Sequence, residues 1–323
     1  MVSLPWQDAP ATGAPRGTHA THTPAEGLSP AADAANCVGH LPAAEWGNRD
    51  AQQHQEPATA PDWVNREGLI ATQGSRRILI TVSYDGTAYA GWQRQQNAMT
   101  VQQRLEDALT ALTGHKTTLY GASRTDAGVH ALGQCAHFDT RCRIPAERYP
   151  FALNTMLPPD IRVLAGRAVG ETFHARFDAK GKQYTYRIHN ARHASAILRN
   201  QTAHVPVPLD VPAMQAALPK LLGTHDFAAF QASGGTAKTT VRTLRALTLV
   251  AQGEELTLTV EGNAFLYNMV RVIAGTLMDI GKGKLNGDCF ARALQTGNRL
   301  LLGTTAPACG LTLTRIDYDL PAR

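Results

Sequence analysis

The pattern of apolar and polar positions separates an unpatterned segment of the chain from a patterned one. Residues 1–73 contain eight prolines and fifteen alanines and show no sustained periodicity. Such a segment buries too little apolar surface to offset its chain entropy. We therefore expect residues 1–73 to be a disordered, low-complexity extension, or the product of a start codon assigned too early. Patterned sequence begins near Ser75.

Alternation and helical periodicity predict the first elements of the patterned segment. Apolar residues at every second position indicate a strand from Arg76 to Tyr84. The clearest helix lies between Thr100, which can form a capping box with Gln103, and Gly114, which is suited to end the helix. After this helix, short strands are predicted over residues 119–120, 133–138 and, beyond a polar connection rich in arginine, 161–169.

The same order of elements recurs in the second half of the chain. Pro219 should kink or shorten the first helix of this half. The predicted elements are a strand over 183–189, a helix over 210–223, a hairpin over 243–250 and 255–261, an apolar helix over 264–280, a short helix near 290–294 and a strand over 311–318.

Two successive strand–helix–strand–strand units predict an α+β fold. We expect two similar lobes of the RRM or ferredoxin-like kind, which share a largely antiparallel central sheet with flanking helices. The N-terminal lobe would span residues 74–178 and the C-terminal lobe residues 179–323. Sheets of this kind are common platforms for RNA.

Charge is distributed unevenly along the chain. Residues 1–73 carry three basic and eight acidic side chains, a net of −5, which leaves 28 basic and 18 acidic side chains, a net of +10, in residues 74–323. A basic folded segment suits a polyanionic partner such as nucleic acid, although positive charge can also serve solubility alone.

Cysteine usage and hydropathy limit the compartment. The five cysteines are scattered and form no CxxC pair, which argues against a disulfide framework or a zinc site and favours the reducing cytoplasm. No run of about 18 apolar residues is present, and the N-terminus lacks the basic start and apolar core of a signal peptide. We expect neither a membrane span nor secretion.

The candidate chemistry is concentrated in residues 121–130, which read Gly-Ala-Ser-Arg-Thr-Asp-Ala-Gly-Val-His. Gly121 and Gly128 allow the backbone to turn sharply and another molecule to approach closely. Asp126 lies near Arg124, whose positive charge favours the ionised carboxylate. An ionised carboxylate suits a nucleophile and not a general acid. The alternative is an aspartate that only caps a turn.

Other chemistry-bearing residues allow two interpretations each. Arg271, on the apolar helix, needs a partner if it is buried, and Asp126, Asp279 or the chain terminus could supply it. Lys182 and Tyr184 are further candidates, and Tyr184 lies on the predicted strand, where a tyrosine belongs to the core more often than to an active site. The candidates for direct contact with nucleic acid, although a loop tryptophan is more often buried, are Trp92, Gln93 and Arg94.

Several classes of site are not indicated. No histidine pair has metal-ligand spacing, no glycine-rich loop precedes a helix as a phosphate cradle would, and no serine elbow is present. A glycosidase would need a second carboxylate near Asp126. None adjoins it in sequence, although a distant one could fold nearby.

These motifs together resemble the tRNA pseudouridine synthase A family. The run from Arg124 to His130 is highly specific, whereas Ser123 stands where many relatives have glycine. The resemblance covers about residues 76–318 and leaves out residues 1–73. The matching stretches, in family order, are Tyr84 to Thr87 with Tyr89, Gly91 to Gln93, Thr100 to Gln102 with Leu105 and Glu106, Gly121 with Arg124 to His130, Lys182 with Tyr184 and Tyr186, Leu222 to Phe227 with Phe230, Phe265 with Met269 to Arg271, and Gly310 with Leu311.

The resemblance implies an isomerase that converts uridine to pseudouridine at positions 38, 39 and 40 in the anticodon stem-loop of tRNA. It also implies a two-lobed fold, a homodimer and no cofactor. By resemblance, Asp126 is the nucleophile, Tyr184 stacks on the target base and serves as general base, Arg271 pairs with Asp126, and Arg124 helps to flip the uridine. The further candidates for RNA binding are Lys182, Trp92, Gln93, Arg94 and His130.

Two rival functions remain open at this point. One is a non-catalytic RNA-binding module with the same double fold, and the presence of Asp126, Arg124, Tyr184 and Arg271 together argues against it. The other is a nucleoside glycosidase, and the lack of a second acid next to Asp126 argues against that.

Overall fold

A computed structural model describes residues 74–321, so the extension predicted over residues 1–73 lies outside the described residues. The strands are β1 (Arg76–Tyr84), β2 (Tyr120–Gly121), β3 (His130–Thr140), β4 (Ile161–Val169), β5 (Ala179–Asn190), β6 (Ala203–Val205), β7 (Gly223–Asp226), β8 (Val241–Gln252), β9 (Glu255–Gly262) and β10 (Leu311–Tyr318). The α-helices are α2 (Val101–Thr113), α3 (Tyr149–Asn154), α4 (Val211–Ala217), α5 (Met269–Gly281) and α6 (Cys289–Thr296). Short 3₁₀ turns are η1 (Ala146–Arg148), η2 (Leu218–Leu221), η3 (Ala228–Phe230), η4 (Arg299–Leu301) and η5 (Ala308–Gly310).

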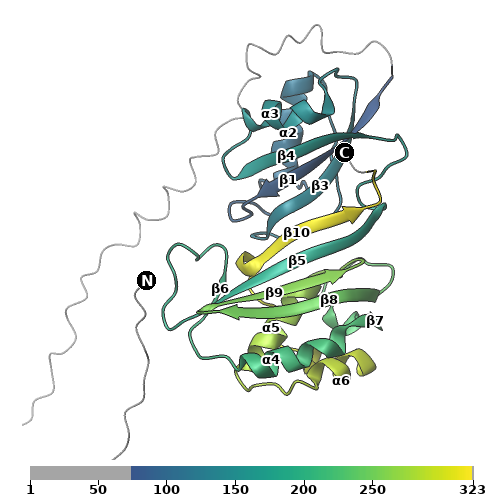
Figure 1. Ribbon diagram of the computed structural model, residues 1–323. Helices are drawn as coiled ribbons and strands as arrows, with labels where there is room; N and C mark the ends of the chain where they lie inside the picture. The colour runs from purple at the N-terminus through teal and green to yellow at the C-terminus, as the bar shows by residue number, and fades with distance from the viewer. Residues whose placement is uncertain (1–73, 322–323) are drawn as a thin grey trace, which may run out of the picture. The chain divides into compact units, whose positions relative to one another are not determined.

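All ten strands of the described residues join one sheet. Its main order is β4-β1-β3-β10-β5-β9-β8-β7, with β2 paired to β3 and β6 paired to β5. The last strand of the chain, β10, therefore lies in the middle of the sheet, between the strands of the first half and those of the second (Figure 1). Only the β3–β10 and β5–β6 pairs are parallel. The predicted α+β fold with a largely antiparallel sheet and flanking helices is confirmed, and the lobe boundary after residue 178 stays a prediction.

Local sequence accounts for the first elements as predicted. Ile78, Ile80 and Val82 alternate along β1 and have no exposed surface. The side-chain oxygen of Thr100 accepts a hydrogen bond from the backbone N–H of Gln103 at the start of α2, and Gly114 ends the helix at φ 75°, a conformation that favours glycine. Figure 1 shows α2 and α3 beside the strands of the first half, and α4, α5 and α6 beside β8 and β9.

The predicted apolar helix over 264–280 is wrong at its start. The helix, α5, begins only at Met269, because Asn268 before it adopts the left-handed conformation at φ 60° and ends any helical path from residue 264. Pro219 does shorten the predicted helix over 210–223, since α4 ends at Ala217 and continues as the 3₁₀ turn η2. The short helix α3 was expected to be a connection.

No helix within residues 74–321 is both long enough and apolar enough to cross a membrane.

Candidate active site

Residues 121–130, the motif loop, are held by backbone contacts with the turn that follows β1. The backbone N–H of Trp92 donates to the carbonyl of Thr125 at 3.0 Å, and the hydroxyls of Tyr84 and Thr125 lie 2.7 Å apart. A Cβ on Gly91 would lie 2.5 Å from the carbonyl oxygen of Thr125. Gly128 has φ 76°, which a side chain rarely tolerates. The turn after β1 and the motif loop therefore pack as one unit, which presents Asp126.

Trp92 fills the space beneath this loop. A Cβ on Gly121 would lie 2.3 Å from the indole nitrogen of Trp92, so glycine is required there for close approach. The tryptophan is 1% exposed. The expectation that its ring meets nucleic acid is therefore corrected: in this structure Trp92 supports the motif loop from within the core, which was the alternative interpretation.

Asp126 contacts Arg271 across 145 residues of sequence. Nη1 of Arg271 donates to Oδ2 of Asp126 at 3.1 Å and to Oδ1 of Asn268 at 2.7 Å, and Nε donates to the carbonyl of Ala306 at 2.8 Å. The side chains of Arg271 and Asp126 are 17% and 27% exposed. The guanidinium is thus fixed on three sides while the carboxylate stays accessible. The alternative partner, Asp279, instead pairs with Lys282 at 3.7 Å.

Ser123 connects the motif loop to β5. Its hydroxyl lies 2.9 Å from the hydroxyl of Tyr184 and accepts a hydrogen bond from Nζ of Lys182 at 3.3 Å, and Lys182 also donates to the carbonyl of Ala122 at 2.9 Å. The side-chain amide of Gln134 bonds to both the N–H and the carbonyl of Ser123. This residue is therefore a structural link, where the sequence marked it only as a departure from the family pattern.

Burial controls the protonation of the two β5 side chains. Desolvation raises the pKa of Tyr184 to about 12, with the nearby Asp126 charge acting in the same direction and the Ser123 hydrogen bond opposing it. The Tyr184 ring also packs edge-on against Phe265, with centroids 5.1 Å apart. Desolvation, together with the positive charges of Arg176 and Arg242, lowers the pKa of Lys182 to about 8. Tyr184 is thus protonated at neutral pH, and the ammonium group of Lys182 is partly buried against Ala122 and Ser123.

Of the remaining candidates, Arg124 and Arg94 lie at the protein surface and His130 lies in the interior. Arg124 is exposed, and its Nε donates to the side-chain oxygen of Gln93 at 3.2 Å. Arg94 forms an ion pair with Glu106 at 2.9 Å. His130 is buried, with Nδ1 accepting from the N–H of Gly86 and Nε2 lying 3.2 Å from the carbonyl of Cys309. The expectation that His130 binds RNA is therefore corrected, because both ring nitrogens are committed inside the protein.

The structure brings Asp126, Arg271, Tyr184 and Lys182 into one cluster, with Arg124 at its rim. Sequence reasoning missed Asn268, which accepts from Arg271, and Gln134, which holds Ser123. An asparagine inside the predicted helix over 264–280 was an available signal for the first, because asparagine tolerates the left-handed conformation better than most residues. A fully buried glutamine on β3 carries no comparable signal in sequence.

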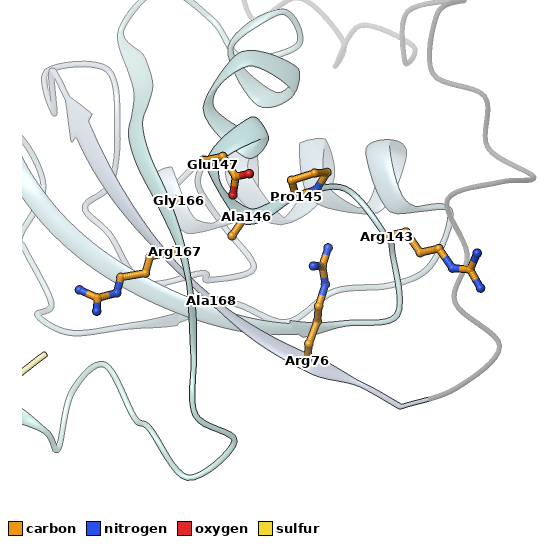
Figure 2. A pocket seen from close by; sticks show the side chains of 8 residues that line it. All are labelled: Arg76, Arg143, Pro145, Ala146, Glu147, Gly166, Arg167 and Ala168. Atoms are coloured by element: carbon orange, nitrogen blue, oxygen red, sulfur yellow. The ribbon is translucent and has the colours of Figure 1, made fainter. Parts of the chain in front are cut away.

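A basic hollow elsewhere on the surface does not belong to this cluster. It is lined by Arg76, Arg143 and Arg167 among others, and Figure 2 shows Arg143 and Arg167 pointing away from its centre while Arg76 is directed toward Pro145. Arg76 pairs with Thr140 at the far end of β3, about 30 Å along that strand from His130 and the motif loop. Within residues 74–321, no group of three histidine, cysteine, aspartate or glutamate side chains could hold a metal ion.

Comparisons with known proteins show the family of the chain. A family model described as tRNA pseudouridine synthase matches residues 80–178 and 217–319. The protein named tRNA pseudouridine synthase A from Acetivibrio thermocellus is 49% identical over 243 residues, which cover 75% of this chain and 100% of the relative. The protein of the same name from Halalkalibacterium halodurans is 47% identical over 237 residues, which cover 73% of this chain and 90% of the relative.

Proposed function

The chain belongs to the tRNA pseudouridine synthase family, whose activity is the isomerisation of uridine in tRNA, and on this premise we propose that it acts at positions 38, 39 and 40 of the anticodon stem-loop with Asp126 as nucleophile. The observation that carries the proposal is the 3.1 Å contact between Asp126 and Arg271. That contact presents one accessible carboxylate, in a fixed orientation, at the surface of a basic protein.

The proposed reaction starts with attack by a nucleophile and not with protonation by a general acid. The N1–C1′ bond breaks, the uracil rotates, a C5–C1′ bond forms, and one proton leaves C5 while another is gained at N1. No electrons are gained or lost overall, so the proposed reaction requires no redox cofactor. A carboxylate can start it by attacking either C1′ or C6, and the proposal holds for both. Arg271 keeps the carboxylate of Asp126 oriented for that attack.

Tyr184 is assigned to the uracil. Its ring offers a flat face of the kind on which bases stack. Because burial raises its pKa to about 12, Tyr184 enters the reaction protonated. To accept the C5 proton as general base it must first release its own phenolic proton to solvent, while the Ser123 hydroxyl, 2.9 Å away, holds the phenol oxygen in place.

Arg124 is assigned to base flipping. A uridine in a stem or stacked loop must leave its stack to reach Asp126, at a cost of about a few kcal/mol. The exposed guanidinium of Arg124, two residues before Asp126 and supported by Gln93, can occupy the vacated space and stack on the neighbouring bases. Because all uridines are chemically alike, selection among them must come from RNA shape and backbone contacts.

The wider proposals follow from the family. We assign tRNA as the macromolecular substrate, a homodimer as the working assembly and the cytoplasm as the compartment. Sedimentation equilibrium of the purified protein tests the dimer, and a monomer at micromolar concentration that is fully active would exclude it.

One assay tests the main proposal. Purified protein is incubated with an unmodified tRNA transcript without any added cofactor, and pseudouridine is mapped by chemical labelling and primer extension. We expect product confined to positions 38–40. Product elsewhere would refute the proposed positions, and the absence of product with a folded, RNA-binding protein would favour the non-catalytic alternative. Release of free uracil would favour the glycosidase.

A further inference from the structure

Four aromatic side chains form a connected cluster beside the motif loop. We call Tyr120, His137, His174 and Phe177 the aromatic platform. The rings of Tyr120 and His137 are stacked, with centroids 5.0 Å apart and planes at 19°. His174 lies 4.7 Å from His137 and 4.3 Å from Phe177, centroid to centroid. The cluster is continuous from its first ring to its last.

One part of the platform is buried and another is exposed to solvent. His137 is buried, whereas Tyr120 is 47% exposed and Phe177 is 74% exposed. Single apolar side chains at a surface are ordinary. Two large exposed rings joined through histidines form a broader aromatic surface.

Hydrogen bonds from the segment before β5 hold the platform in shape. The backbone N–H of Arg176 donates to Nδ1 of His174 at 3.1 Å, and the N–H of Ala175 donates to Nδ1 of His137 at 3.1 Å. Burial, with the charges of His174 and Arg77 adding to it, lowers the pKa of His137 to about 4. The central ring is therefore neutral at physiological pH, and the surface is preorganised for stacking.

The platform adjoins the candidate active site. Tyr120 opens β2, three residues before Ser123, which is about 10 Å along an extended chain. Lys182, which contacts Ser123, senses the charge of Arg176. One stretch of polypeptide thus runs from the platform into the motif loop, and an RNA nucleotide a few positions from the target could reach the platform.

Charge at the platform suits a nucleic acid. The guanidinium of Arg176 lies 5.8 Å from the centroid of the Phe177 ring. Arg176 is exposed, and no carboxylate within the described part of the chain forms an ion pair with it. Arg176 can therefore bind a phosphate group while the aromatic rings stack on the base.

We propose that the aromatic platform binds an unpaired nucleobase of the RNA loop that carries the target uridine, with Arg176 on the phosphate of that nucleotide. The proposal rests on the proposed function, because it takes the RNA to be the substrate bound at Asp126. Aromatic faces bind single-stranded bases with little regard to sequence. The platform would therefore hold loops of different sequence in the same register, so that the target reaches Asp126.

The test compares two exposed phenylalanines in the same chemical setting. Phe151 on α3 is 65% exposed and has the guanidinium of Arg148 at 5.7 Å, but it lies beside the edge strand β4, away from the motif loop. Phe177→Ala is the test variant and Phe151→Ala the matched control. Both positions are mostly exposed, so both variants should fold, which thermal unfolding checks.

Binding is measured with an anticodon stem-loop RNA and with versions in which one loop nucleotide at a time is abasic. For the wild-type protein, we expect one abasic position to raise Kd by about 5- to 100-fold, the usual range for a lost base stack. Phe177→Ala should raise Kd for the intact RNA by a similar factor and should no longer distinguish the intact RNA from that abasic RNA. Phe151→Ala should behave as the wild type.

Three results would overturn the proposal. The first is equal affinity of Phe177→Ala and Phe151→Ala for the intact RNA. The second is an abasic penalty that persists unchanged in Phe177→Ala. The third is a shift in oligomeric state on Phe177→Ala, measured without RNA, which would assign the platform to contact with a second copy of the chain. Failure of the proposed function shows separately, as absence of pseudouridine with the wild-type protein on full-length tRNA.

Discussion

Replacing Asp126 by asparagine separates the catalytic interpretation from the structural ones. Asparagine keeps the shape of the side chain and one oxygen that can accept from Nη1 of Arg271, now 3.1 Å from the carboxylate, but it removes the negative charge. If Asp126 is the nucleophile, turnover should fall by at least about 10⁴-fold, because no neighbouring side chain in the motif loop replaces it.

The structure also sets the expected cost in stability. The amide oxygen of the variant still accepts a hydrogen bond from the charged guanidinium of Arg271, so only the ion-pair contribution is lost, about 1 kcal/mol for a partly exposed pair. The full loss of a buried pair, roughly 3–5 kcal/mol, is not expected, because Arg271 keeps Asn268 and the carbonyl of Ala306. A loss of about 1 kcal/mol lowers Tm by about 2–4 °C in a domain of this size.

Three measurements on this variant distinguish the effects on catalysis, on RNA binding and on stability: single-turnover formation of pseudouridine, Kd for tRNA and Tm. Affinity should stay within about threefold, because distributed phosphate contacts supply most of it. A stably folded Asp126→Asn protein that forms pseudouridine at a substantial rate, with deamidation excluded by mass spectrometry, would refute the nucleophile assignment. A fall in Tm well beyond the expected range would instead assign Asp126 mainly to holding Arg271.

The other predictions concern the support of the site, its pH dependence and its charge. Asn268→Gly should keep the backbone at φ 60° but lose the acceptor for Arg271, so activity should drop about tenfold and stability should fall by about 1–2 kcal/mol. Asn268→Ala should lose about a further 1–2 kcal/mol, and equal Tm values for the two variants would contradict the role of the left-handed backbone. Because the pKa of Lys182 falls from 10.5 when unfolded to about 8 when folded, the contribution of Lys182 to stability should rise with pH across this window. Denaturant unfolding at pH 7.5 to 10.5 should show this rise in the difference between wild type and Lys182→Met, and parallel curves would exclude it. The net charge of +10 in residues 74–323 predicts that Kd for tRNA rises roughly tenfold or more between about 50 and 200 mM salt, and a flat response would mean that phosphate contacts contribute little.

Elements governed by neighbours in sequence were predictable from the sequence. The strand β1 follows from alternation, and α2 follows from its apolar stripe and from the caps at Thr100 and Gly114. The need for glycine at residues 121 and 128 was also predictable from the sequence. The structure gives a different reason at each position: close contact with Trp92 at residue 121 and a positive φ at residue 128. These features depend on backbone conformation over a few residues, which local sequence controls.

Features that depend on distant contacts were decided only by the tertiary structure. Sequence left Arg271 with three possible partners, Asp126, Asp279 and the chain terminus, and the fold selected Asp126 because the insertion of β10 between β3 and β5 joins the two halves into one sheet. The choice between Trp92 as a ligand and Trp92 as core was settled in the same way, by the motif loop closing over its ring. Residue type and spacing state which interactions a side chain can make. Which of these interactions a side chain makes depends on its neighbours in space, and the chain topology can bring these from more than a hundred residues away in sequence.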